Sequence, residues 1–177
     1  MPDQPTSDTL ADGSNPATPE DLFRRLRELG IAFSTFEHAA VFTVEEAKVH
    51  RGHLPGCHTK NLFLRDKKEQ MWLVVCPENR AISLKDLAAQ LGANHLSFGS
   101  ADRLMRFLGV IPGAVTPFAV VNDHWRRVRV VLDRDVLQHD MLNFHPLVNQ
   151  MTTSLGSADF LRFLEAEGHA PSIVPME

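Results

Sequence analysis

The densest group of reactive side chains lies in residues 50–58, where His50, His53, Cys57 and His58 are four possible zinc ligands. Structural zinc sites usually bring two short ligand pairs together from separated elements. Neighbouring residues of an extended loop point their side chains in opposite directions, so Cys57 and His58 are poorly placed to share one ion. The sequence therefore predicts no metal site in this segment.

The spacing of the serines and cysteines gives little support to nucleophilic catalysis. Cys76 ends the apolar run of residues 71–76, a position typical of a small buried side chain. Ser97 and Ser154 lack the GxSxG pattern that exposes a serine nucleophile on a sharp turn. We therefore expect no covalent intermediate, although nine histidines offer possible bases.

A different combination pairs Lys60 and Asn61, at the start of a predicted strand, with the glycine- and proline-rich loop 109–113. A lysine supplies a point charge for a phosphate or for a developing oxyanion. Glycines let backbone N–H and C=O groups approach a small substrate closely. Taken separately, the two halves are also typical of a solvated strand end and an ordinary turn.

His145 precedes a polar stretch that contains Asn149 and residues 152–154. A single histidine in an apolar strand is more often a hydrogen-bonded core residue than a functional one. The residues alone leave both interpretations open.

Helix-start signals recur along the chain and indicate the elements that must position these side chains. Thr18, Pro19 and Asp21 form an N-cap signal, and leucines then follow at helical spacing up to Gly30. Similar signals predict further helices at residues 43–51, 83–91, 100–108 and 157–167.

Alternating or continuous apolar runs predict the strands. Residues 59–66 and 70–77 form a hairpin closed by a charged turn. Because many neighbouring strands are joined by hairpin-length turns, we expect the α/β class, with a mixed, largely antiparallel sheet surrounded by helices. The other predicted strands are residues 31–38, 118–122, 128–133, 141–146, 150–154 and 171–174.

The charge distribution divides the chain of 177 residues, whose net charge is −4, into two parts. Residues 1–17 contain three aspartates, no lysine or arginine, and little to bury, which predicts a disordered acidic extension. Residues 18–177 are nearly neutral and long enough for a single domain with its own core. Any contact with nucleic acid must therefore come from a local basic patch.

The N-terminus has neither the basic start nor the apolar stretch of a signal peptide, and two cysteines cannot form a disulfide framework. The apolar runs are also shorter than the ~20 residues that a membrane helix needs. We therefore expect a cytoplasmic protein without membrane contact.

Four ordered segments carry a resemblance to a known family. The chain resembles the YbaK/ProX superfamily of aminoacyl-tRNA editing domains from about residue 18 to about residue 174. It is most similar to the free-standing ProXp-ala (PrdX) branch, itself similar to the insertion domain of bacterial prolyl-tRNA synthetase. The segments are FEHAAVFTVEEA, GCHTKNLFLRDKKEQMWLVV, GVIPGAVTPFAVVND and LNFHPLVNQMTTSLGSADFLRFLEAEG.

The resemblance implies a trans-editing deacylase that hydrolyses alanine mischarged onto proline tRNA, without metal or other cofactor. Lys60 matches the lysine that anchors the terminal nucleotide, and Asn61 follows it as in this branch. His145 matches the histidine of the FHP motif, which lines the amino-acid pocket. The GxxPG loop, which holds the aminoacyl group and the hydrolytic water, corresponds to Gly109, Pro112 and Gly113, and its TPF continuation supplies Thr116 and Phe118 to substrate binding.

The resemblance also implies partners: the 3′ aminoacyl end and acceptor stem of mischarged proline tRNA, with transient contact to prolyl-tRNA synthetase or an elongation factor. Cys57 departs from the small residue common in relatives, which indicates a modest change in loop packing. Two alternatives stay open, a deacylase for cysteine on proline tRNA and a non-catalytic module that binds the tRNA 3′ end. The sequence also leaves open whether Arg126, Arg127 and Arg129 touch the acceptor stem.

Overall fold

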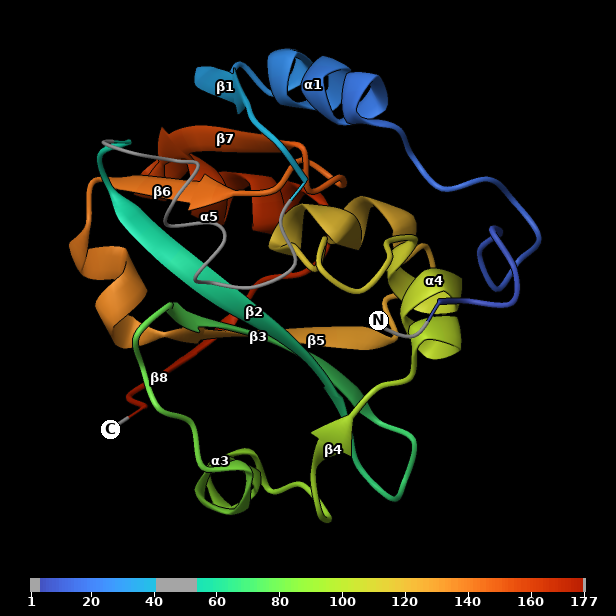
Figure 1. Ribbon diagram of the computed structural model, residues 1–177. Helices are drawn as coiled ribbons and strands as arrows, with labels where there is room; N and C mark the ends of the chain where they lie inside the picture. Colours follow the sequence, from blue (N-terminus) through green and yellow to red (C-terminus); the bar gives the residue numbers. More distant parts are fainter. Residues whose placement is uncertain (1–3, 41–53, 177) are drawn as a thin grey trace.

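The computed structural model describes residues 4–40 and 54–176, and its centre is a mixed sheet in the order β1-β7-β6-β2-β3-β5-β8, with β4 also paired to β2 (Figure 1). The predicted helix at 43–51 lies outside the described residues. The strands are β1 (Phe33–Glu37), β2 (Cys57–Arg65), β3 (Met71–Pro77), β4 (Ser97–Phe98), β5 (Val128–Asp133), β6 (Met141–Phe144), β7 (Met151–Gly156) and β8 (Ser172–Val174).

Local capping residues define where the helices begin, as the sequence predicted. Thr18 forms a complete capping box with Asp21, and Ser83 and Ser100 each accept a hydrogen bond from the third backbone N–H that follows. The last α-helix is the exception, because Gly156 precedes it without a side-chain cap. The helices are α1 (Pro19–Glu28), α3 (Leu84–Leu91), α4 (Ala101–Leu108) and α5 (Ser157–Ala166), with 3-10 helices η1 (Pro117–Asn122) and η2 (Arg134–Gln138).

The predicted mixed sheet is confirmed, and its pairings are more evenly divided than the largely antiparallel arrangement expected. β2 and β3 form the predicted hairpin, and β6–β7, β1–β7 and β2–β4 are also antiparallel. β2–β6, β3–β5 and β5–β8 are parallel. β2 therefore joins an antiparallel partner on one side to a parallel partner on the other.

The strand predicted at 118–122 is wrong, because these residues form η1. The Thr116 hydroxyl accepts a hydrogen bond from the backbone N–H of Phe118, and Pro117 occupies the first helical position. A proline has its φ preset for this position and lacks only an N–H that the helix would leave unpaired. These local restraints override the strand tendency of the apolar run that follows.

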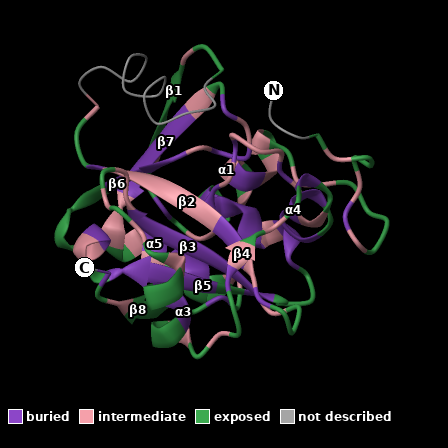
Figure 2. Cartoon of the chain, turned by 60° about the horizontal axis from the view of Figure 1, so that its bottom comes forward, coloured by how far each residue is buried: buried purple, intermediate pink, exposed green. Residues whose placement is uncertain are grey.

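Two apolar clusters pack on the two faces of the sheet. The larger contains side chains from α1, α4, α5 and η1, together with Phe63 of β2. The smaller lies beneath α3 and contains Leu64 of β2 and Val74 of β3. Figure 1 shows α3 and α4 on opposite sides of β2 and β3, and Figure 2 shows β3, β5 and β7 largely buried while most of β2 is of intermediate exposure. Successive residues of β2 therefore face different clusters.

The N-terminal segment differs from the disordered extension predicted for residues 1–17. Leu10 is buried, the backbone N–H of Ala11 donates to Arg106 O at 2.8 Å, and that of Ala17 donates to Asn122 Oδ1 at 2.8 Å. Gly109 leaves room for this contact, since a Cβ there would lie 3.0 Å from Leu10 Cδ2. One leucine and a few backbone hydrogen bonds hold the segment, although it has no apolar periodicity.

Among the described residues, no helix has the length and hydropathy required to cross a bilayer.

Candidate active site

A polar surface begins where β2 pairs in parallel with β6. His58 is level with Asn143, whereas Cys57 and Leu142 are level with each other and turn toward the larger apolar cluster. Since side chains alternate along a strand, Lys60 shares the face of His58 and Asn143. We call this side of β2, β6 and β7 the polar face.

Asn143 is the centre of the hydrogen bonds on the polar face. Its amide nitrogen donates to Pro55 O at 2.9 Å and to Cys57 O at 3.3 Å, while its amide oxygen accepts a hydrogen bond from the Ser154 hydroxyl. Both side chains are buried. A buried amide with partners on both ends fixes the relative position of the strands that it joins.

His145 lies two residues beyond Asn143, just after the end of β6. Its Nδ1 is 2.8 Å from Met151 O, and a carbonyl oxygen can only accept. In the neutral ring the proton therefore sits on Nδ1, and Nε2 keeps its lone pair. Nε2 has no hydrogen-bond partner within residues 4–40 and 54–176, so it is the open nitrogen of this ring.

His38 lies beside His145, with 6.0 Å between the ring centroids. Its Nδ1 is 2.7 Å from Ala39 O and its Nε2 is 2.9 Å from the Thr152 hydroxyl. Burial lowers the pKa of His145, the hydrogen bond to Met151 O opposes this shift, and the charge of His38 adds to it. His145 is therefore neutral at neutral pH and available as a hydrogen-bond acceptor.

Lys60 supplies the positive charge of the polar face. Its side chain is half-buried, and in the described part of the chain its ammonium makes no ion pair. It is level with Cys76 of β3. Lys60 and His145 each follow the paired His58 and Asn143 by two residues, so they occupy equivalent positions in the parallel register of β2 and β6.

The loop between α4 and η1 turns sharply at Pro112 and Gly113. The backbone N–H of Ala114 donates to Ile111 O at 3.0 Å, and Gly113 has φ +93°. Proline followed by a residue with positive φ is typical of a type II turn. The N–H groups of Gly113 and Val115 donate no hydrogen bond to any described residue, so they are free backbone donors.

Asn61 holds this loop to β2 from the side opposite Lys60. Its amide nitrogen donates to Val115 O at 3.2 Å, whereas its amide oxygen is buried without a partner among the described residues. The side chain faces the larger cluster along with Phe63. The structure thus assigns Asn61 to positioning the loop, from the face opposite Lys60.

Gly109 and Thr116, two of the predicted site residues, have structural roles here. Gly109 is the left-handed C-cap of α4, and its N–H donates to Leu104 O and Met105 O, so it is not a free donor. A Cβ at Gly109 would lie 2.5 Å from Asn122 Nδ2. Thr116 is buried and caps η1.

Phe118 is fully buried between Phe144 and Phe163, with edge-on ring contacts of 5.6 and 5.5 Å between centroids. It therefore does not line a substrate surface as expected. It supports the site indirectly, because it packs beneath the strand that carries His145.

The histidine and cysteine group at 50–58 is described only in part, since His50 and His53 lie outside the described residues. Cys57 and His58 point to opposite faces of β2, and burial raises the pKa of Cys57 to about 11. Burial likewise raises the pKa of Cys76 to about 11. Both thiols are therefore protonated at neutral pH and poorly suited as nucleophiles or metal ligands.

Sequence reasoning missed His38 and Asn143, and it considered Ser154 as a possible nucleophile and as part of the polar stretch at 152–154 but not as the partner of Asn143. Asn143 and Ser154 are cross-strand partners, and the register of β6 with β7 aligns them. The alternation of polar residues at 152 and 154 is a signal that could have identified this face. No local signal pairs His38 with His145.

The chain matches known proteins over most of its length. The sequence model of the family described as "Aminoacyl-tRNA editing domain" matches residues 38–163. A Danio rerio protein named prolyl-tRNA synthetase associated domain-containing protein 1 is 40% identical over 171 residues, covering 93% of each chain. An Acetoanaerobium sticklandii protein named prolyl-tRNA editing protein ProX is 38% identical over 149 residues, covering 84% of this chain and 91% of that one.

The fold is also similar to a solved structure described as a proposed trans-editing enzyme for prolyl tRNA synthetase. The TM-score is 0.68 at 16% identity, and the match covers 91% of this chain and 98% of the other. At this identity the similarity supports the architecture described above.

Proposed function

We propose that this chain, which belongs to the aminoacyl-tRNA editing domain family, is a trans-acting deacylase that hydrolyses alanine from mischarged proline tRNA. The observation that carries the proposal is the polar face. It presents the cationic Lys60 and the neutral His145 at equivalent register positions of neighbouring parallel strands. The names of the two relatives described above support prolyl tRNA as the substrate class.

An aminoacyl ester is already activated, so hydrolysis requires a positioned water and a stabilised oxyanion rather than a nucleophilic side chain. His145 Nε2 can accept a proton from the attacking water, because its Nδ1 is engaged by Met151 O. The water oxygen bonds to the ester carbonyl carbon, and the bond from that carbon to the ribose oxygen breaks. The ribose oxygen takes a proton, which releases free alanine and the tRNA hydroxyl.

Among the described strands, none pairs with residues 60–62 of β2 on the side away from β3, and the loop at Pro112 and Gly113 would reach the ester around this open edge to provide donors for the developing oxyanion. The N–H groups of Gly113 and Val115 have no partner among residues 4–40 and 54–176 and are held on a defined turn. Asn61 fixes this turn through Val115 O. Lys60 contributes the charge that holds the phosphate or ribose of the terminal nucleotide. No metal or cofactor takes part in this scheme.

Selectivity for alanine follows from a size argument. A synthetase pocket that binds proline cannot strongly exclude a smaller amino acid, since a few methylenes are worth only ~1 to 3 kcal/mol. A second, smaller pocket can reject proline by steric overlap, because overpacking costs ~1 to 3 kcal/mol. Cysteine on the same tRNA is the competing substrate.

The decisive experiment is deacylation of proline tRNA charged separately with alanine, cysteine and proline. We expect the alanyl ester to be hydrolysed fastest and the prolyl ester to persist. Faster release of cysteine would assign the alternative specificity. Equal hydrolysis of the alanyl and prolyl esters would contradict an editing role, and binding without hydrolysis of any ester would identify a non-catalytic module.

A further inference from the structure

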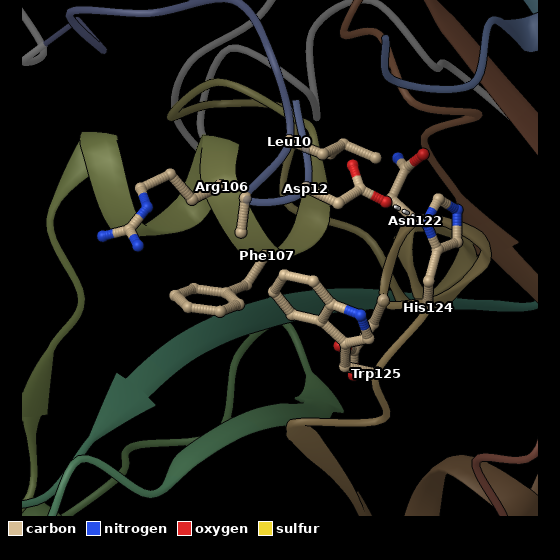
Figure 3. Close-up of a pocket in the computed structure, with 9 residues that line it drawn as sticks. Leu10, Asp12, Arg106, Phe107, Asn122, His124 and Trp125 are labelled. Carbon is tan, nitrogen blue, oxygen red and sulfur yellow. Dashed lines mark hydrogen bonds and ion pairs between the residues drawn. The ribbon is translucent and has the colours of Figure 1, made fainter. Parts of the chain in front are cut away.

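A second surface stands apart from the polar face, at the turn between η1 and β5. Trp125 is 55% exposed, although it is one of only two tryptophans in the chain. Arg126 and Arg127 follow it and are exposed, and Arg106 of α4 lies nearby. We call Arg106, Trp125, Arg126 and Arg127 the arginine–tryptophan surface. Figure 3 shows Trp125, Phe107 and Arg106 around the small hollow that Leu10 also lines.

Buried groups hold this turn in place. The Asp123 carboxylate accepts hydrogen bonds from the backbone N–H of Arg127 at 3.0 Å and of Val128 at 2.8 Å. It also contacts His169 Nε2 at 2.9 Å, and both side chains are buried. Arg126 has φ +53° and packs over Gly168, where a Cβ would lie 2.3 Å from the guanidinium Nε. The exposed side chains are therefore carried by a rigid turn.

The arginines of this surface differ from most others in the described chain. Arg106 and Arg127 both lie over the Phe107 ring, at 5.3 and 5.7 Å from its centroid, and neither makes an ion pair with a described residue. Arg126 also makes none there. By contrast, six arginines pair with carboxylates: Arg24, Arg25, Arg65, Arg80, Arg103 and Arg162.

The nearby acidic groups are already engaged. Asp102, one turn before Arg106, accepts hydrogen bonds from Thr6, and Asp12 contacts His124 and Ser14. Asp123 is used within the turn. The charge of Arg106 acts on Asp102, but no described carboxylate forms an ion pair with the guanidinium groups of the arginine–tryptophan surface.

Unpaired guanidinium groups beside an exposed indole fit RNA. Guanidinium recognises phosphate through a bidentate arrangement, and an indole offers a face on which a base or ribose can stack. In a chain with a net charge of −4, such a local patch is the means by which RNA can be held.

The sheet register relates this surface to the polar face. Val128 is level with Met71 and Arg65, whereas Leu132 is level with Val75 and Asn61. Four residues along a strand span ~13 Å. The turn before β5 is therefore ~13 Å from Lys60 along the strands, and α4 with Arg106 lies on the other face of the sheet, so a tRNA whose 3′ end reaches Lys60 must pass the end of the sheet to meet the arginine–tryptophan surface.

From these observations we propose that the arginine–tryptophan surface binds the acceptor stem of the tRNA whose 3′ end occupies the polar face. This inference rests on the proposed function for its substrate, but the surface is a separate site. It predicts that RNA affinity and ester hydrolysis can be separated by substitution.

The test compares the double variant Arg106→Gln/Arg127→Gln with wild type in binding uncharged proline tRNA, followed by fluorescence anisotropy over a salt series. We expect at least tenfold weaker binding at low salt. Because each neutralised phosphate contributes ~0.9 to the slope of log K against log salt, the slope should fall by about 2. Trp125→Ala should weaken binding with little change in slope.

Two controls remove the same charge elsewhere. Arg134→Gln removes an exposed arginine of η2 that has no ion pair among the described residues, and Arg162→Gln removes an ion-paired arginine of α5. The double variant Arg134→Gln/Arg162→Gln removes the same number of positive charges as the test variant, and we expect it to bind tRNA as wild type does. Unfolding curves confirm that each variant is folded.

Hydrolysis provides the second readout. With full-length alanyl-tRNA the double variant should raise KM and leave kcat nearly unchanged, and with a short alanylated 3′ oligonucleotide it should match wild type. Unchanged tRNA affinity and salt slope in the double variant would overturn the inference. If the double variant keeps its tRNA affinity but no longer binds prolyl-tRNA synthetase, the surface is a protein interface and the inference is also overturned. Wild-type protein that binds tRNA but hydrolyses no ester would instead refute the proposed function alone.

Discussion

Two histidines of this chain, the half-buried His145 and the buried His169, lie in different regions and make different hydrogen bonds. His145, at the end of β6, uses Nδ1 on Met151 O and leaves Nε2 without a partner in the described chain. His169, after α5, places Nδ1 2.9 Å from Glu167 O and Nε2 2.9 Å from the Asp123 carboxylate. The first ring has an unused nitrogen, and the second has none.

This difference indicates which histidine serves chemistry and which serves the fold. A catalytic base needs one nitrogen oriented by the protein and the other open to a reactant. A structural histidine places both nitrogens against protein partners, as His169 does. Its partner Asp123 in turn orders the turn that displays Trp125.

The largest expected effect separates the two histidines by stability. His169→Ala leaves the buried Asp123 carboxylate without its side-chain partner, and leaving a buried polar group unsatisfied costs ~1 to 3 kcal/mol, and more when that group is charged. His145→Ala should cost much less, since only one hydrogen bond to a backbone carbonyl is lost. Urea unfolding of both variants measures the difference, and equal losses of stability would remove the distinction.

A substitution on the polar face should lower the deacylation rate without lowering stability. Lys60→Ala should leave the fold intact, because the ammonium has no ion pair in the described structure, but should reduce deacylation ten- to hundredfold. Loss of a charge-assisted contact to phosphate costs ~1.5 to 3 kcal/mol. Single-turnover hydrolysis of alanyl-tRNA tests this, with Lys85→Ala on α3 as the matched lysine control. A folded Lys60→Ala protein with wild-type rates would refute the assigned role.

These contrasts also show what the sequence can and cannot predict. Helix starts at Thr18, Ser83 and Ser100 depend on residues three positions apart, so local patterns identify them. The β2–β3 hairpin is equally local. The FAVVN segment was misassigned because its apolar composition suits a strand, while the cap at Thr116 and the preset φ of Pro117 favour η1.

The candidate site was predicted unevenly for the same reason. Lys60 and His145 fall on one face because β2 pairs in parallel with β6, a contact between segments far apart in the sequence. Family resemblance supplied both residues, whereas the partnership of His38 with His145 required the fold. Resemblance also placed Gly109 in the site, but its N–H donates hydrogen bonds to carbonyl oxygens in the last turn of α4.

Deleting residues 1–14 should have a smaller effect, on stability. The segment buries Leu10 beside Gly109 and donates one backbone hydrogen bond to Arg106 O. A buried leucine is worth ~1.5 to 3 kcal/mol, and ordering the segment offsets part of this, so a net loss of ~1 to 2 kcal/mol is expected. Leu10→Ala in the full chain should reproduce most of the loss. An unchanged unfolding curve for both would show that the segment does not contribute to stability.

The smallest effect concerns the pH profile of hydrolysis. Burial lowers the pKa of His145, so the neutral ring persists to a lower pH than that of a free imidazole. If neutral His145 accepts the proton of water, the rate is constant near neutrality and falls only in acid, as the ring is protonated.

His38→Ala removes a nearby charge that lowers this pKa and admits water to the site, and both changes raise the pKa. The acid limb of kcat should then move to higher pH, whereas His139→Ala, at an exposed position, should leave the limb in place. A shift to lower pH, or an equal shift in both variants, would show that the acid limb belongs to a group other than His145.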